Sequence, residues 1–267
     1  MGKTQQIIER RVDELRQNMF VIHQLVIRDK KRSLSSTFMG ELWEVINPLI
    51  NMVVMVLVFG KMFGDGSSSR FPLYVLTGTT IYGLFTSGTT MCLNALMGNK
   101  NFLIKTQLRK NVYVDQKILL AFRNFLFSLM IYAFVIALYR IRPSVTWLLF
   151  IPDILLMLVM MLGIGKILAV INVTFADITY FYKIFTLFLM YGSAIFYRVD
   201  RLSPTMQKCM TILNPLYTVI SISRECVMER MYPNWKLWAI ASAYAGGSYV
   251  VGTIFFNRKI EGIVAKM

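Results

Sequence analysis

Long apolar stretches recur along the chain and alternate with shorter polar segments. Residues 71–99 and 237–257 contain no charged residue and no histidine. About 20 apolar residues are enough to cross the hydrocarbon core of a bilayer, so such stretches qualify as membrane-spanning helices. The pattern predicts an all-α polytopic membrane protein with six transmembrane helices, near Val45–Phe63, Pro72–Met97, Ile118–Tyr139, Val145–Val170, Tyr180–Tyr197 and Leu237–Phe256.

The segment before the first predicted span has a different pattern. Its apolar residues recur at steps of four and three, which places them on one face of a helix. They are Ile8, Val12, Leu15, Met19, Ile22 and Val26. Residues 1–44 are therefore predicted to form an amphipathic N-terminal helix that lies along a membrane surface or packs under the protein.

Two connections are too long for simple turns. Residues 98–117 mix basic and apolar side chains, and residues 198–236 are too apolar for a solvated loop. Pro204 and Pro215 divide the second segment, which indicates a hairpin of two short helices. Backbone of this kind is tolerated at membrane depth only when it is buried in protein or lines a cavity, so we interpret 198–236 as a re-entrant hairpin on the outer side.

Basic residues outnumber acidic ones, 29 to 14, and most of them lie between the apolar spans. Anionic lipid headgroups explain such a distribution better than nucleic acid does. The basic cluster at 28–32, just before the first span, favours a cytoplasmic amino terminus under the positive-inside rule. Six spans place both termini there, with 98–117 and the tail 257–267 on the cytoplasmic side and 45–256 as the transmembrane domain.

Residue types suited to catalysis are scarce. The predicted spans contain no histidine, and the three cysteines of the chain lack the spacing of a metal site. An embedded enzyme needs an acid–base pair, a metal cluster or an activated nucleophile, so we predict no catalytic and no metal-binding residue. Cys209 and Cys226 share the 198–236 segment and could pair, although two free thiols are the simpler expectation.

Aromatic side chains form stripes along three of the predicted spans. Stacked aromatic faces could let a sugar chain slide without being held, although core packing and lipid contact explain aromatic side chains equally simply. The candidates for a substrate pathway are Phe71, Tyr74, Tyr82, Phe85, Phe122, Phe125, Phe181, Phe185 and Phe188.

An ordered set of short motifs resembles one transporter family. Arg28-Asp29 is followed by the run Phe38–Leu49, which contains Trp43 and Asn47-Pro48. Phe175-Ala176-Asp177 comes before the fifth predicted span, and Tyr197, Asn214-Pro215 and Arg224 lie in the outer segment. In this order they resemble the type-2 ABC exporter permeases for polysaccharides, O-antigens and teichoic acids. Ala176 and Ala194 depart from the family pattern, which has a basic residue and a proline there.

The resemblance implies a plasma-membrane permease that is not itself an enzyme and binds no cofactor. Its implied partners are a second copy of the chain, two ATP-binding cassette subunits that hold ATP and magnesium, membrane lipids, and a lipid-linked glycan or teichoic-acid polymer. Arg28, Asp29, Trp43, Asn47 and Pro48 would form the interfacial helix and hinge, and Tyr197, Asn214, Pro215 and Arg224 the outer hairpin. The implied ATPase-coupling residues are Asn101, Phe102, Leu103, Lys105, Arg109 and Lys110.

Two other functions remain open from the sequence. A permease of the same type could export a drug or a small lipid instead of a polymer. A membrane-embedded transferase acting on lipid-linked sugars would need acidic residues at the membrane face, and the sequence contains no convincing pair.

Overall fold

A computed structural model describes residues 17–31, 70–105, 109–199 and 202–264, together with residues 46, 49–50, 53–54 and 57. The described residues fold into helices and form no strand, in agreement with the predicted all-α class. Trp43, Asn47 and Pro48, and most of the first predicted span, lie outside the described residues.

Eight numbered helices follow the segment 17–31, which is itself helical. They are α3 (Phe71–Leu93), α4 (Lys100–Lys105), α5 (Val112–Leu138), α6 (Phe150–Thr174), α7 (Ile178–Gly192), α8 (Pro204–Leu213), α9 (Pro215–Arg224) and α10 (Trp235–Val264). Short 3₁₀ turns precede α4 and α6, at Met97–Asn99 and Val145–Leu149, and a π-helical turn, Glu225–Glu229, extends α9.

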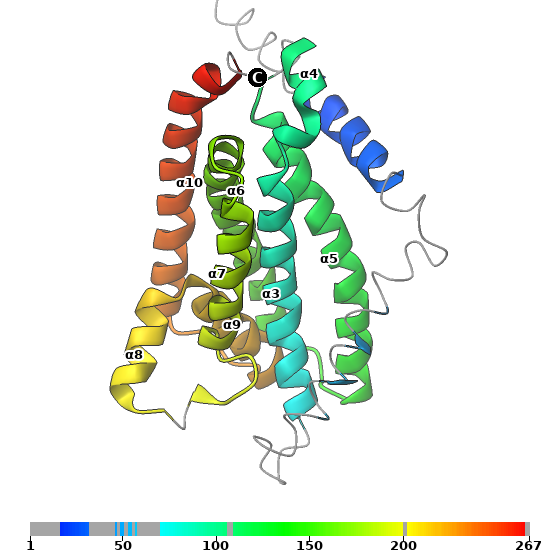
Figure 1. Ribbon diagram of the computed structural model, residues 1–267. Coiled ribbons are helices and arrows are strands. Elements are labelled where there is room, and N and C mark those ends of the chain that lie inside the picture. The colour runs from blue at the N-terminus through cyan, green and yellow to red at the C-terminus, as the bar shows by residue number, and fades with distance from the viewer. Residues whose placement is uncertain are drawn as a thin grey trace, which may run out of the picture.

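The long helices α3, α5, α6, α7 and α10 run along a common axis, and successive ones are antiparallel (Figure 1). Helix α6 packs most extensively against α10 and also packs against α3, while α3 packs against α5. Helix α7 is peripheral, since Tyr182 is its one buried residue.

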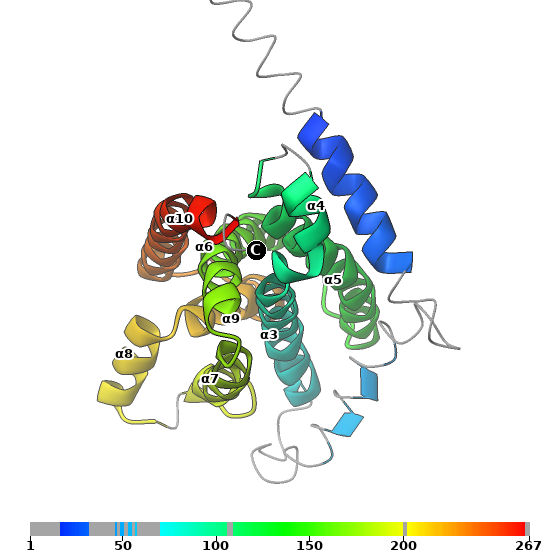
Figure 2. The same ribbon diagram turned by 45° about the horizontal axis from the view of Figure 1, so that its top comes forward.

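Different helices and connections lie at the two ends of the bundle. The first, here called the α4 end, carries α4, the helical segment 17–31 and the end of α10; the other, the α8 end, carries α8, α9 and the connection after α5 (Figures 1 and 2). The segment 17–31 packs through Ile22, Leu25 and Val26, whereas Met19 of the predicted apolar stripe is exposed.

Within the described residues, three helical segments are long and apolar enough to cross a membrane: Val112–Leu138, Val145–Thr174 and Trp235–Val264. The six-span prediction is therefore not confirmed. Helix α3 is rich in threonine and glycine, which lowers its hydropathy. Helix α7 has 15 residues and extends only about 22 Å at 1.5 Å per residue, which is shorter than a bilayer core.

The two prolines of the 198–236 segment start two helices, as the sequence predicts. Ser203 and Asn214 are the residues before these prolines, and their side chains accept hydrogen bonds from backbone N–H groups of the first turns of α8 and α9. The re-entrant placement of this pair in a membrane stays a prediction.

Helices α6 and α10 approach each other closely at two glycines. A methyl group added at Gly252 would overlap the backbone of Gly163, and one added at Gly163 would overlap the backbone at Ser248. Small residues allow helix backbones to approach in this way within membrane proteins. This contact therefore fixes α6 against α10, two helices that both run along the bundle.

Candidate functional site

The predicted pathway aromatics of α3 and α5 lie mainly inside the chain. Phe71, Phe85 and Phe125 are buried, and Phe122 stacks on Phe125 with ring centroids 6.2 Å apart. The Tyr82 hydroxyl donates to the Thr186 carbonyl of α7 at 2.9 Å. Within one copy of the chain these side chains hold helices together.

The predicted aromatics of α7 are arranged differently. Phe181, Phe185 and Phe188 are 60%, 53% and 72% exposed, and they follow one side of a peripheral helix. Next to this stripe, the Tyr182 hydroxyl donates to Thr89 Oγ1 at 2.6 Å, which anchors α7 to α3. The two sets of aromatics thus differ in exposure, and the α7 set is the more accessible to a molecule outside the chain.

A charged cluster at the α4 end centres on Asp29. Its carboxylate accepts hydrogen bonds from Arg28 at 2.7 Å, from Lys117 Nζ at 2.6 Å and from Gln116 Nε2 at 2.6 Å. Arg28 also donates to Asn99 Oδ1 at 2.7 Å, and its guanidinium lies 5.2 Å from the centroid of the Phe102 ring. The Asp29 cluster therefore links the segment 17–31 to α5 and to the turn that leads into α4.

The electrostatics of the cluster favour the ionised form of Asp29. Partial burial acts to raise the pKa of the carboxyl group, but the hydrogen bonds from Lys117, Arg28 and Gln116, together with the Lys117 charge, outweigh it and hold the pKa below its usual value. Charge-assisted hydrogen bonds are the strong ones among protein hydrogen bonds. The cluster is thus a firm connection between separate elements at neutral pH.

The predicted coupling residues lie in α4 and just before α5, and one of them, Phe102, contacts this cluster through Arg28. Asn101 and Phe102 are exposed on α4, and Leu103 of the same helix is buried. Arg109 is exposed and Lys110 half-buried just before α5, and Lys105 is the last residue of α4. The α4 helix thus has one face held in the protein and another that a partner could contact.

At the α8 end the structure buries Arg224. Its guanidinium donates to the carbonyls of Ala194 at 3.1 Å and Tyr74 at 3.2 Å, and its centre lies 3.4 Å from the centroid of the Tyr74 ring. Gly78 makes room for this group, since a methyl group there would lie 2.8 Å from a guanidinium nitrogen. Arginine stays charged in proteins, so these carbonyls and this ring replace its hydration.

Other predicted hairpin residues surround Arg224. The Tyr74 hydroxyl donates to the carbonyls of Ala194 and Tyr197 at 3.2 and 3.0 Å. The Asn214 amide donates to Ser193 Oγ at 3.0 Å, while its oxygen caps α9, which starts at Pro215. Arg224 and Asn214 thus fasten α9 to the segment that follows α7, and the Tyr197 carbonyl connects that segment to α3.

The sequence did not identify several polar residues that the structure brings together. Gln116 and Lys117 complete the Asp29 cluster, and Asn99 joins it to the turn before α4. Within α6, buried Asp153 accepts from Ser223 Oγ at 2.6 Å, and Lys166 donates to Thr253 Oγ1 at 3.0 Å. Polar residues inside an apolar helix were the available signal, but their partners lie 70 to 88 positions away in the chain.

No group of three histidine, cysteine, aspartate or glutamate side chains is placed to hold a metal ion within the described part of the chain. Cys92, Cys209 and Cys226 are free thiols. Cys209 is exposed on α8, whereas Cys226 is buried in the π-helical turn.

Comparison with known proteins places this architecture in a family. The family model for ABC-2 type transporters matches residues 21–228. The chain belongs to the ABC-2 type transporter family. The match extends from the segment 17–31 to the π-helical turn, so it includes both the Asp29 cluster and Arg224.

Individual ABC-2 relatives match at low identity over most of their length. The chain is 25% identical to the O-antigen export system permease protein RfbA of Klebsiella pneumoniae, over 86% of this chain and 88% of that protein. It is 24% identical to the protein of the same name from Myxococcus xanthus, over 94% and 97% of the two chains. The polysialic acid transport protein KpsM of Escherichia coli is 23% identical over 78% and 81%.

These findings establish the resemblance that the sequence motifs indicated, including the membrane permease class. An ABC-2 permease is a non-catalytic membrane subunit, which agrees with the expectation that the chain is not an enzyme. The ABC-2 assignment and the apolar helices together indicate a multi-pass protein of the plasma membrane.

Proposed function

We propose that this ABC-2 permease forms the transmembrane pathway of an ATP-driven exporter for a lipid-linked polysaccharide or teichoic-acid polymer. The observation that carries the proposal is the match to O-antigen export permeases over nearly the whole chain. The similarity to a polysialic acid transport protein supports a glycan polymer over a drug or a small lipid.

In this proposal a separate ATP-binding cassette subunit binds ATP and magnesium and docks at the α4 end, which faces the cytoplasm. Exposed Asn101 and Phe102 of α4 would contact that subunit. Phe102 lies against Arg28, and Arg28 is paired with Asp29, so a displacement of α4 would reach the segment 17–31 and α5 together. The Asp29 cluster is the means of transmission in this scheme.

Two copies of the chain and two ATP-binding subunits would make the complete exporter. The exposed aromatic face of α7, with Phe181, Phe185 and Phe188, is the part of the predicted pathway that one copy leaves uncovered. A glycan could stack on such rings while it moves, because aromatic faces bind sugars without fixing one register.

The test is depletion of the chain in its host, followed by analysis of lipid-linked glycans and by purification of the chain in mild detergent. The proposal predicts that a lipid-linked polymer accumulates on the cytoplasmic side and that a nucleotide-binding subunit co-purifies. Unchanged glycans together with an altered drug or lipid profile would contradict the polymer cargo. Failure to recover a nucleotide-binding subunit from an intact, folded preparation would contradict the ATP-driven mechanism.

A further inference from the structure

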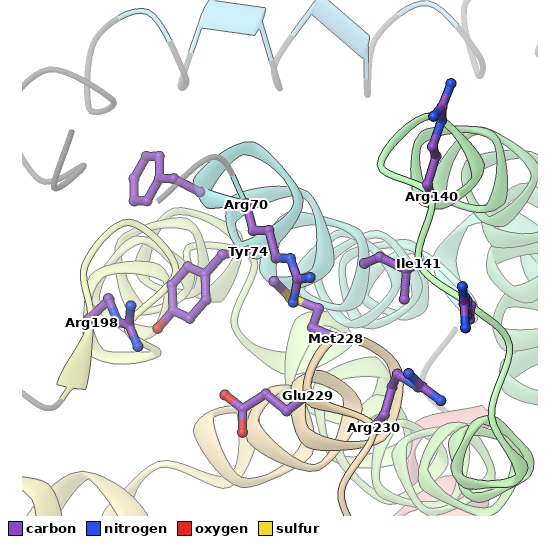
Figure 3. Close-up of a pocket in the computed structure, with 10 residues that line it drawn as sticks. Arg70, Tyr74, Arg140, Ile141, Arg198, Met228, Glu229 and Arg230 are labelled. Carbon is purple, nitrogen blue, oxygen red and sulfur yellow. The ribbon is translucent and has the colours of Figure 1, made fainter. Parts of the chain in front are cut away.

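A pocket of about 620 Å³ opens at the α8 end, beside but separate from the buried Arg224. Five arginines line it, and Glu229 is the one acidic residue among its described lining residues (Figure 3). The arginines are Arg70, Arg140, Arg142, Arg198 and Arg230. None of the predicted pathway or coupling roles accounts for so many cations around one cavity.

The charges of this pocket are not neutralised in the way that those of the Asp29 cluster are. Among the described residues, the side chains of Arg70, Arg140, Arg142 and Arg230 make no hydrogen bond and no ion pair. Figure 3 shows Arg70 extending from the start of α3 toward Met228, with Tyr74 and Arg198 on one side and Ile141 and Arg230 on the other. Arg140 points away from this centre in the same view.

The backbone at Arg230 is unfavourable for arginine. Its φ is 57°, in the left-handed region that glycine adopts easily, and it ends the π-helical turn, where the Met231 N–H donates to the Glu225 carbonyl at 2.9 Å. Arg140 has the same conformation, with φ of 52°, just after α5. Arginine at these positions costs stability relative to glycine, so the local fold does not explain the charge.

The position of the pocket indicates what it could bind. Arg70 directly precedes α3, and Arg140 and Arg142 follow α5, so the guanidinium groups lie where these helices end. Lipid phosphates lie at the ends of membrane-spanning helices, and guanidinium groups bind phosphate oxygens bidentately. Tyr74, Ile141 and Met228 add an aromatic and apolar wall suited to the adjoining sugar or hydrocarbon.

We propose that this arginine pocket binds the phosphoryl group of a lipid at the membrane face of the α8 end. The phosphoryl group could belong to a resident anionic phospholipid or to the isoprenoid carrier of the exported glycan. The site does not depend on the cargo, whereas its assignment to the carrier rests on the proposed function.

The test compares lipids that differ only by their phosphate, using native mass spectrometry of the full chain in detergent. The probes are dioleoyl phosphatidylglycerol against dioleoylglycerol, and undecaprenyl phosphate against undecaprenol. We expect each phosphate-bearing lipid to bind at least about tenfold more tightly than its alcohol counterpart, as several charge-assisted hydrogen bonds would give. Tighter binding of undecaprenyl phosphate than of phosphatidylglycerol assigns the site to the carrier; the reverse order assigns it to a resident phospholipid.

The principal variant combines Arg230→Gly with Arg70→Gln. Glycine fits the left-handed backbone at position 230, so the variant should fold, while the preference for phosphate falls at least about fivefold. The matched control, Lys208→Gln with Lys236→Gln, removes two exposed cations from the same end but outside the pocket, and should leave the preference unchanged. If the double variant does not accumulate, Arg142→Gln alone carries the same test with a smaller loss.

Equal binding of the phosphate and alcohol lipids to the wild-type chain would overturn the proposal. An equal loss in the lysine control would also overturn it, because the effect would then reflect net charge alone. Unchanged glycan export after depletion of the chain, together with normal phosphate binding, would instead count against the proposed function alone, so the two failures are distinguishable.

Discussion

The two ends of the bundle use charge in opposite ways. At the α4 end, Asp29 pairs with both Arg28 and Lys117, so these two cations share an anionic partner within the chain. At the α8 end, a pocket is lined by five arginines and a single glutamate. A paired cluster fastens elements together, whereas cations without an anionic partner, such as Arg70, Arg142 and Arg230, attract an anion from outside. This difference supports the proposed roles of coupling at the α4 end and lipid-phosphate binding at the α8 end.

Arg224 shows that charge at the α8 end can also be structural. It is buried and bonded to backbone carbonyls, whereas the pocket arginines are exposed. The distinction at this end is thus one of burial: buried Arg224 holds the hairpin, whereas exposed Arg70, Arg142 and Arg230 make no ion pair among the described residues.

The largest expected effect comes from breaking the structural part of the α8 end. Arg224→Met removes the buried guanidinium that donates to the carbonyls of Ala194 and Tyr74 and lies on the Tyr74 ring, which should lower the free energy of unfolding by about 3 kcal/mol. Unfolding of the purified chain in mixed micelles measures this. Arg224→Lys, which keeps a charge but cannot reach all acceptors, should lose less; an unchanged stability for Arg224→Met would show that the hairpin does not depend on this group.

The next effect concerns the close contact between α6 and α10, the helices that run along the bundle from one end to the other. Gly252→Ala should lower the free energy of unfolding by about 2 kcal/mol, because its methyl group overlaps the backbone of Gly163 and forces α6 and α10 apart. Gly247→Ala is the matched control on the same helix, since a methyl group there meets nothing within 4 Å and should stabilise α10 by a few tenths of a kcal/mol or more. Equal destabilisation by both variants would contradict the close approach of the helices.

Breaking the α4 end should cost less stability but should uncouple transport. Asp29→Asn removes the negative partner of Arg28 and Lys117, and we expect a loss of about 1–2 kcal/mol in the free energy of unfolding. The variant should still bind a nucleotide-binding subunit but export less polymer per ATP hydrolysed. Retained coupling would contradict the role of the Asp29 cluster in transmission.

The same cluster predicts a pH dependence with a definite sign. Because the folded state holds the pKa of Asp29 below its usual value, the stabilisation is complete above the pKa of the unfolded chain, about 4, and is lost as the pH falls through the lower folded value. The stability difference between the wild-type chain and Asp29→Asn should therefore shrink below pH 4. A difference that stays constant down to pH 2 would show that the Asp29 charge is not the cause.

The smallest effect sharpens the comparison at the arginine pocket. Arg230→Gly should raise the free energy of unfolding by about 0.5 kcal/mol, since glycine adopts the left-handed backbone without steric cost. Thermal unfolding measures this change in the free energy of unfolding. The control is Lys236→Gln, an exposed substitution outside the pocket. A clear loss of stability would mean that Arg230 serves the fold rather than a ligand.

The sequence predicted the helical class, the family and the two helices that start at Pro204 and Pro215, because periodicity and turn residues are local signals. Its count of six spans is not confirmed, and most of the first predicted span lies outside the described residues. The threonines and glycines of α3 lower its hydropathy, and α7 ends at Gly192, five residues before the predicted boundary at Tyr197.

The candidate sites depended on contacts that no local pattern contains. Lys117 meets Asp29 across 88 positions of chain, and the pocket arginines come from four separate segments. Aromatic stripes looked alike in α3, α5 and α7, yet Phe85 and Phe125 are buried while Phe188 is 72% exposed. Burial depends on which neighbours a helix acquires, and the period of a stripe does not specify them.

The most direct test of the account is site-specific photocrosslinking in the assembled exporter. A photoreactive amino acid would replace Asn101 on α4 in one variant and Thr205 on α8 in another, both exposed positions. If the ATP-binding subunit docks at the α4 end, an adduct with it should form from position 101 and none from position 205. An adduct from position 205, or none from position 101 in an intact and active complex, would contradict the assignment of coupling to the α4 end.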